Sequence, residues 1–139
     1  MNQSQKVLVA GTGLSGTAAA RLVLDRGGEV VLYDKEAKVS VVLGEIKRSD
    51  LLGVELCIIS PGIPLDSPFV AVVDDAKIPI LGEIELAYQC SLGRLAAITG
   101  TNGKTTTTAL TGEILKAKYE ETFVVGNIGD PYTSRVLEM

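Results

Sequence analysis

The sequence predicts an α/β protein in which buried strands alternate with helices in a parallel, doubly wound sheet. Two observations support this class. Short, continuous apolar runs at 6–10 and 56–59 have the pattern of strands buried on both faces. Glycine-rich turns follow apolar runs at 11–16 and 100–105, and a helix is expected after each turn.

A strand–turn–helix–strand unit opens the chain. The strand at 6–10 leads into a helix at 17–26, whose apolar residues recur at helical spacing. Gly27-Gly28 ends this helix, as glycine at a helix C-terminus usually does. A second strand follows at 29–33 and ends at Asp34. Because such β-α-β units are right-handed, the two strands are expected to be parallel.

The alternation continues to about residue 90. The apolar run at 39–43 fits either a short helix or a strand. The strand at 56–59 is expected to end at the sequence Ser-Pro-Gly-Ile-Pro. The remaining elements are a helix at 68–75 with Pro68 in its first turn, a strand at 77–81 and a helix at 83–89.

A second unit opens at residue 95. Its expected elements are a strand at 95–99, a helix at 106–116, a strand at 122–125 and the start of a helix at 131–139. A lone unit of this size buries little core, so we expect a first domain at 1–93 and the opening of a larger domain at 94–139. Because so small a sheet has unpaired edges, residues 94–139 should be mobile, packed on the first domain, or held by a neighbouring chain.

Composition excludes several classes of function. The 139 residues carry a net charge of −4 and include no histidine, which excludes Ser-His-Asp catalysis and His-ligated metals. The acidic balance disfavours nucleic-acid binding. No apolar stretch reaches the roughly 18 residues of a membrane span, and no signal peptide opens the chain. Cys57 and Cys90 do not make a disulfide framework, so we expect a cytoplasmic protein without membrane insertion.

The first glycine motif meets the physical requirements of a phosphate-binding turn. Gly11 permits a tight turn, Gly13 lets a pyrophosphate approach the backbone, and Gly16 lets helix and strand pack closely. The helix that follows offers free N–H groups and a partial positive charge. Asp34 lies near the position where dinucleotide-binding folds place an acid for ribose hydroxyls. A nicotinamide-dinucleotide-dependent oxidoreductase therefore stays an alternative, beside a turn that serves packing alone.

The second motif, Gly-Thr-Asn-Gly-Lys-Thr at 100–105, is also a candidate phosphate site. Its backbone N–H groups are suited to phosphate oxygens, Lys104 adds a cation, and the Thr105 hydroxyl is placed to hold Mg²⁺. The usual phosphate loop has glycine where this chain has Ile98, so the loop is shorter at its entrance. A plain turn with an exposed lysine is the alternative.

A third candidate is the loop after the strand at 56–59. Ligands of open parallel sheets lie outside the carboxyl ends of the strands, so this loop shares an edge with the first glycine motif. Gly62 is placed to bring its backbone close to the same ligand, although a rigid turn fixed by Pro61 and Pro64 is equally simple. Glu83 and Glu85 are interpreted only as acids that suit the dipole of a helix's first turn.

Five motifs together resemble one family. They are Gly-Thr-Gly-Leu-Ser-Gly at 11–16, Ser-Pro-Gly-Ile-Pro at 60–64, Gly-Glu-Ile-Glu-Leu at 82–86, Thr-Gly-Thr-Asn-Gly-Lys-Thr-Thr at 99–106 and Gly-Asn-Ile-Gly at 126–129. Over essentially its whole length the chain resembles the N-terminal part of the Mur ligases. The first two motifs make it most similar to the branch that adds D-glutamate to UDP-N-acetylmuramoyl-L-alanine in peptidoglycan synthesis. Ile98 is normal for that family.

The resemblance implies a Rossmann-like domain that binds UDP rather than NAD, followed by the truncated start of a P-loop ATP-binding α/β domain. It implies that ATP and Mg²⁺ bind the second motif, where Lys104 is catalytic and Thr105 is a metal ligand. The implied ATP-binding residues are Gly100, Thr101, Asn102, Gly103, Lys104, Thr105 and Thr106. It implies substrate contacts at Gly13, Leu14, Ser15, Asp34, Lys35, Ser60, Gly62, Ile63 and Asn127.

The resemblance also implies a reaction. The alanine carboxylate of UDP-N-acetylmuramoyl-L-alanine receives a phosphoryl group from ATP, and the amino group of D-glutamate attacks the acyl phosphate to form an amide. Catalysis is mainly positioning and charge neutralisation by Lys104 and Mg²⁺. Family residues that complete the site would follow Met139, so this chain alone is expected to be inactive and the full-length protein a monomer. A non-catalytic nucleotide sensor is a further alternative.

Overall fold

The computed structural model of the chain describes residues 4–34, 42–43, 45–126 and 130–138. Its centre is a five-stranded parallel sheet in the order β3-β2-β1-β4-β5. The strands are β1 (Lys6–Ala10), β2 (Glu29–Asp34), β3 (Val42–Leu43), β4 (Leu56–Ile59) and β5 (Ile80–Gly82). The predicted α/β class is therefore confirmed.

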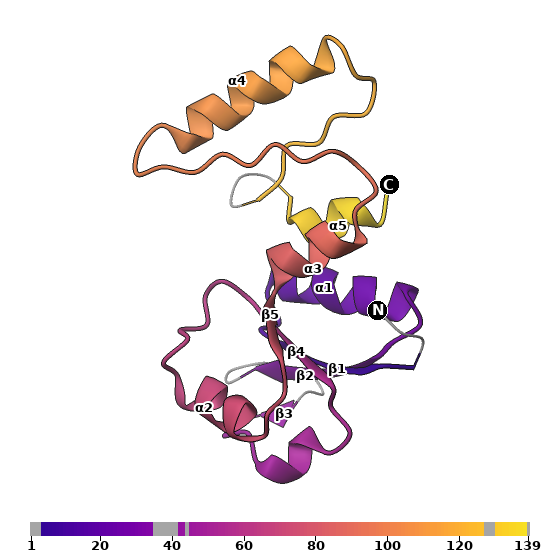
Figure 1. Cartoon of the computed structure of the whole chain (residues 1–139), viewed down its shortest axis with the longest axis vertical. Helices are drawn as coiled ribbons and strands as arrows, with labels where there is room; N and C mark the ends of the chain where they lie inside the picture. Colours follow the sequence, from indigo (N-terminus) through magenta and orange to yellow (C-terminus); the bar gives the residue numbers. More distant parts are fainter. Residues whose placement is uncertain (1–3, 35–41, 44, 127–129, 139) are drawn as a thin grey trace.

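Helices cover both faces of the sheet (Figure 1). The helices in the described part of the chain are α1 (Leu14–Asp25), the 3₁₀ helix η1 (Arg48–Leu51), α2 (Pro68–Asp75), α3 (Glu83–Cys90), α4 (Lys104–Lys116) and α5 (Tyr132–Val136). Successive residues of β1 face opposite sides, because strand side chains alternate. Leu8 packs with η1 and α2, whereas Val7 and Val9 pack with α1, α3 and α5. On the α2 side the rings of Tyr33 and Phe69 stack with their centroids 4.4 Å apart.

Most predicted bounds in the first half hold to within three residues. α1 begins at Leu14 rather than residue 17, because the Thr17 N–H already donates to the Gly13 carbonyl at 2.9 Å. β5 begins at Ile80 rather than residue 77, because Lys77 has a left-handed φ of 59° that ends the preceding helix. Within the ambiguous run 39–43, the described part is the strand β3.

The prediction of strands at 95–99 and 122–125 is wrong, because neither of these described ranges forms a strand. Residues 95–99 have no regular structure, and Leu95 is 46% exposed. In the second run only Val125 makes a β-bridge, an isolated one with Asp130. A strand needs a neighbour to take its backbone hydrogen bonds, and apolar character alone does not supply one.

α4 stands apart from the sheet, whereas α5 packs on α1 and α3 (Figure 1). Gly112 is the one residue of α4 that is buried, and it lies against the side chain of Val124. Tyr132 and Val136 of α5 belong to the same core cluster as α1 and α3. The sequence predicts that residues 94–139 are mobile, packed on residues 1–93, or held by a neighbouring chain. For α5, packing on residues 1–93 is confirmed.

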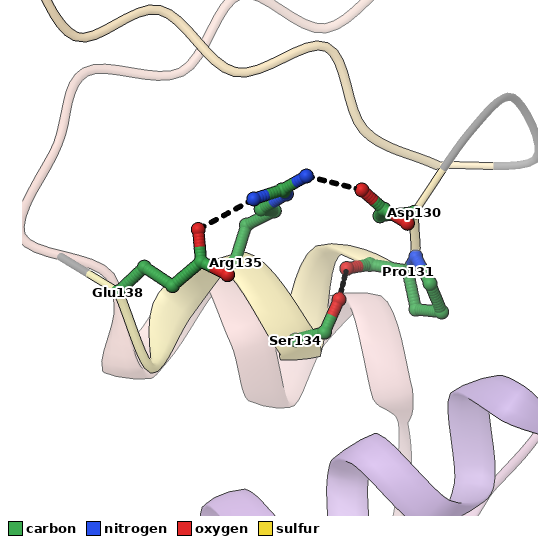
Figure 2. A network of polar contacts seen from close by, with 5 residues as sticks. All are labelled: Asp130, Pro131, Ser134, Arg135 and Glu138. Atoms are coloured by element: carbon green, nitrogen blue, oxygen red, sulfur yellow. Dashed lines mark hydrogen bonds and ion pairs between the residues drawn. The ribbon is translucent and has the colours of Figure 1, made fainter.

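A short polar network braces α5 (Figure 2). The Arg135 guanidinium contacts Asp130 on one side and donates to the Glu138 carboxylate at 2.5 Å on the other. Ser134 Oγ donates to the Pro131 carbonyl at 2.7 Å in the first turn. The hydrogen bond to Glu138, and then that to Asp130, raises the pKa of Arg135 above its usual value. The network therefore links the two ends of this short helix.

None of the helices in the described ranges is both long and apolar enough to cross a membrane.

Candidate functional site

The strand order reverses between β1 and β4, which is where open parallel sheets bind ligands. The glycine turn at 11–16 follows β1, and the loop at 60–64 follows β4 at the same edge. Ser60 joins the two: its Oγ lies 2.8 Å from the position a Cβ on Gly11 would take. The fold thus brings together two of the motifs singled out in the sequence.

The three glycines of the first motif differ in their surroundings. Gly11 has a φ of 98°, which disfavours any side chain, and its N–H donates to the Tyr33 carbonyl at 2.9 Å. A Cβ on Gly16 would lie 2.0 Å from the Gly11 carbonyl oxygen, so no other residue fits there. A Cβ on Gly13 would meet nothing within 4 Å. The turn and packing roles expected for Gly11 and Gly16 are seen directly, and packing does not require glycine at position 13.

The N-terminus of α1 is open. Gly13 is its N-cap and provides no side-chain hydrogen bond to the first turn. Leu14 is 86% exposed and Ser15 is half-buried, so their backbone N–H groups lie at the surface end of the helix. Uncapped N–H groups and the positive end of the helix dipole favour an anion at this place.

Asp34 shapes the turn. Its Oδ2 accepts hydrogen bonds from the Thr12 N–H at 2.8 Å and from the Thr12 hydroxyl at 2.6 Å. The acid predicted as a ligand contact therefore also fastens the glycine turn to the end of β2. Burial, and secondly the charge of Asp34, raises the pKa of the neighbouring Tyr33. Lys35 and Asn127, two other predicted contacts, lie outside the described residues.

Glu83 is the functional candidate that sequence reasoning underestimated. Only 6% of it is exposed, and its Oε2 accepts a hydrogen bond from Ser60 Oγ at 3.2 Å. Glu85, two residues on, is exposed and accepts from Gln89 instead. Both acids lie in the first turn of α3 as expected, but the burial of Glu83 and its contact with Ser60 go beyond that interpretation. The available signal was its place directly after β5, at the ligand edge of the sheet.

In the rest of the loop after β4, Pro61, Gly62 and Pro64 are exposed, whereas Ile63 packs against the core. Gly62 is exposed, and a Cβ there would meet nothing within 4 Å. Ile63 is half-buried, and its N–H donates to the Ser60 carbonyl at 3.0 Å. The loop is thus a closed turn with an open backbone at its tip.

A groove of about 620 Å³ lies beside the N-terminus of α1. One wall is the glycine turn and the outer face of α1, including Leu14 and Arg21. The other wall is α5 and the residues just after it, including Ser134 and Glu138. A segment late in the sequence therefore completes the cavity at the first motif.

The second motif forms the start of α4. Gly100 has a φ of 146°, and Gly103 has a φ of 73° as the N-cap of the helix, so both suit glycine. Lys104 Nζ donates to the Gly100 carbonyl and lies 3.5 Å from the Thr101 carbonyl oxygen. Residues 99–107 are all exposed. Because α4 stands apart from the sheet, the second motif is separate from the first site (Figure 1).

The second motif is compatible with a bound phosphate group. It offers one side chain, that of Thr105, as a ligand for Mg²⁺. Thr105 lies in the exposed first turn of α4. Among the described residues there is no group of three His, Cys, Asp or Glu side chains that would hold a metal ion. Mg²⁺ usually keeps several waters and binds through one or two carboxylates plus substrate phosphates, so the Thr105 hydroxyl would supply one part of such a site.

These features define an α/β protein with two glycine-rich turns that lead into helices, one at the switch point of a parallel sheet and one at the start of α4. Two family models match the chain in the same order. The Mur ligase MurD-like N-terminal domain matches residues 5–82, and the Mur ligase middle domain matches residues 98–137. The chain belongs to the Mur ligase family, and its N-terminal region is of the MurD-like type.

Curated relatives agree with this membership. Proteins named UDP-N-acetylmuramoylalanine–D-glutamate ligase are 47% identical in Lachnospira eligens, over 98% of this chain and 33% of the relative. The protein of the same name in Lachnoclostridium phytofermentans is 43% identical over 95% of this chain and 32% of the relative. That in Caldanaerobacter subterraneus is 42% identical over 98% of this chain and 33% of the relative. The chain spans about one third of the length of these relatives. The oxidoreductase alternative finds no support among them.

Proposed function

We propose that this chain is the N-terminal part of an ATP-dependent ligase that adds D-glutamate to UDP-N-acetylmuramoyl-L-alanine through an acyl phosphate. The observation that carries the proposal is the glycine turn at the sheet's switch point. There an uncapped helix N-terminus, an unobstructed Gly13 and a groove of about 620 Å³ meet. The name of the relatives, UDP-N-acetylmuramoylalanine–D-glutamate ligase, supplies the two compounds that are joined. The use of ATP, the acyl phosphate and the place in peptidoglycan synthesis are carried over from the family resemblance.

The first site is proposed to hold the UDP part of the substrate. The backbone N–H groups of Leu14 and Ser15 donate to the diphosphate, and the bare Gly13 allows its approach. Asp34 keeps the turn in place and lies close to the nucleoside. The remaining proposed contacts, carried over from the family resemblance, are Lys35, Ser60, Gly62, Ile63 and Asn127.

The second site is proposed to hold ATP and Mg²⁺. The loop at 100–103 presents backbone N–H groups, and Thr106 extends the contact surface into the first turn of α4. Lys104 now donates to a neutral carbonyl of its own loop. A phosphate oxygen is a charged and therefore stronger acceptor, so the ammonium group exchanges one for the other and neutralises charge on the transferring phosphoryl group. Mg²⁺, held through Thr105, supplies further charge neutralisation when it is bound.

The domain organisation and setting complete the proposal. We assign residues 1–93 to the UDP-binding domain and residues 94–139 to the start of the ATP-binding domain, with α5 as the part that packs back on the first. Because its substrates are ATP and a UDP-linked precursor, we place the protein in the cytoplasm. The net charge of −4 fits a small-molecule enzyme rather than a nucleic-acid binder. The full-length protein is proposed to act as a monomer.

Titration of the chain with UDP tests the proposal. Backbone amide resonances of Gly13, Leu14, Ser15 and Ile63 should shift on addition of UDP, and NADH should not reproduce the effect. The exposed second motif excludes no water, so the chain alone should release no phosphate in a D-glutamate-dependent manner. Tight NADH binding without any response to UDP would contradict the ligase assignment and restore the oxidoreductase alternative.

A further inference from the structure

A buried acid lies behind the proposed UDP site. In the described part of the chain Glu83 is the one charged residue that is buried, with 6% of its surface exposed. Burying a carboxylate is costly unless hydrogen bonds compensate for the lost water. Glu83 opens α3 directly after β5, so the fold brings its side chain to the ligand edge of the sheet.

The partner of this acid is a residue of the predicted substrate loop. Ser60 Oγ donates to Glu83 Oε2 at 3.2 Å. In this contact the carboxylate oxygen accepts, so the hydroxyl hydrogen of Ser60 points toward α3. The acid therefore fixes the rotamer of Ser60 and the direction of its proton.

The fixed hydroxyl packs against the glycine turn. Ser60 Oγ lies 2.8 Å from the Cβ position of Gly11 and 3.2 Å from that of Gly16, so it occupies the space that the missing side chains leave. The Ser60 N–H donates to the Ala10 carbonyl at 3.2 Å, which holds the same residue to the end of β1. One hydroxyl thus joins the glycine turn, the loop after β4 and the start of α3.

We infer that Glu83 is a positioning residue for UDP binding, which acts through Ser60 to hold the glycine turn and the 60–64 loop in register. This role rests on the proposed function of the first site. Its charge alone would act in the opposite direction, because a carboxylate near a diphosphate repels it. Loss of the acid weakens UDP binding if positioning dominates and strengthens it if repulsion dominates, so the sign of the effect separates the two.

The experiment measures UDP affinity by calorimetry on this chain, at a temperature where circular dichroism shows each variant to be folded. Glu83→Ala and Ser60→Ala should each raise the Kd for UDP about tenfold, the loss expected for one hydrogen bond that organises a site. Because the two residues act through one contact, the Kd for UDP of the double variant should be about the same as that of either single variant. Glu83→Gln, whose amide oxygen accepts the same hydrogen bond, should restore the Kd to within about threefold.

The matched control is Glu85→Ala, on the same helix but exposed, which should leave the Kd unchanged. An unchanged or lower Kd for Glu83→Ala, with UDP still bound by the wild type, overturns the positioning role and leaves the proposed function intact. Failure of the wild type to bind UDP overturns the proposed function, and the positioning role with it. If Glu83→Ala does not fold, Glu83→Met, which keeps the volume but accepts no comparable hydrogen bond, takes its place with the same expected rise in Kd and the same overturning result.

Discussion

At the residue scale, Thr133 occupies an unfavourable environment. Its side chain on α5 is 1% exposed. In the described part of the chain its Oγ1 is the one buried side-chain N or O atom without a hydrogen-bond partner. An unsatisfied buried hydroxyl costs about 1–3 kcal/mol, whereas an apolar group of the same shape does not carry that cost.

Thr133→Val should therefore stabilise the chain by about 1 kcal/mol, since valine keeps the shape and removes the hydroxyl. Urea unfolding followed by circular dichroism measures the change. Thr133→Ser is the control: it keeps the hydroxyl and removes the methyl group, so it should destabilise the chain. A loss of stability in the valine variant would mean that the hydroxyl has a partner in solution.

Cys57 gives a pH dependence of stability. It is fully buried on β4, and burial raises the pKa of its thiol to about 12. In the unfolded chain the thiol has an ordinary pKa of about 8.5. Between these values the unfolded state has lost a proton that the folded state keeps. The free energy of unfolding should therefore decrease as pH rises from about 8.5 to 12, by up to about 1.4 kcal/mol per pH unit.

The check is a comparison with Cys57→Val, which has no thiol to titrate. Unfolding free energies of both proteins between pH 7 and 11 should diverge above pH about 8.5, with the wild type falling more steeply. At pH 8 a thiol reagent should modify the half-buried Cys90 in the folded protein and reach Cys57 only on unfolding. Parallel pH profiles for the two proteins would show that Cys57 ionises alike in both states.

At the element scale, the glycine turn makes a matched pair of substitutions informative. Gly16→Ala places a methyl group 2.0 Å from the Gly11 carbonyl oxygen, so the turn must open. We expect a loss of about 3 kcal/mol or more and no UDP binding. Gly13→Ala meets nothing within 4 Å and has an ordinary φ of −67°, so stability should fall only by the cost of alanine at an N-cap, about 1 kcal/mol or less.

Thermal unfolding and UDP titration of the two variants then separate folding from recognition. If the diphosphate approaches the backbone at Gly13, the stable Gly13→Ala variant should bind UDP about tenfold more weakly, because its methyl group stands in the ligand's path. Equal UDP affinity for Gly13→Ala and wild type would place the phosphate elsewhere.

How far the sequence predicts an element depends on what stabilises it. β1 and β4 have apolar runs and also have partners in the sheet, so their bounds agree with the prediction. The run at 95–99 is as apolar but unpaired, and periodicity cannot report a missing neighbour. The place of Glu83 directly after β5 was a sequence signal, but its burial and the approach of Ser60, which distinguish it from Glu85, are seen only in the structure. Local patterns predicted the two glycine turns and the helices after them, whereas the tertiary contacts that support the first turn lie beyond such patterns.

At the scale of the whole molecule, the last third of the chain divides between two environments. α5 buries Tyr132 and Val136 in the core of the first region and forms one wall of the groove. α4 exposes its large apolar residues, with Leu110 at 61% and Ile114 at 62%. Low burial and exposed backbone hydrogen bonds characterise segments that open with little free energy, so the two helices should differ in local stability.

Amide hydrogen exchange measures this difference. In a dilute monomeric sample, peptides covering α5 should be protected to a degree similar to those covering α1, and peptides covering α4 should exchange orders of magnitude faster, because a marginal isolated helix opens readily. Val136→Ala, which removes buried contacts from α5, should increase exchange in α5 and leave α4 unchanged. Strong protection across both helices would show that α4 packs on the rest of the chain, and rapid exchange in both would show that α5 does not hold its place beside α1.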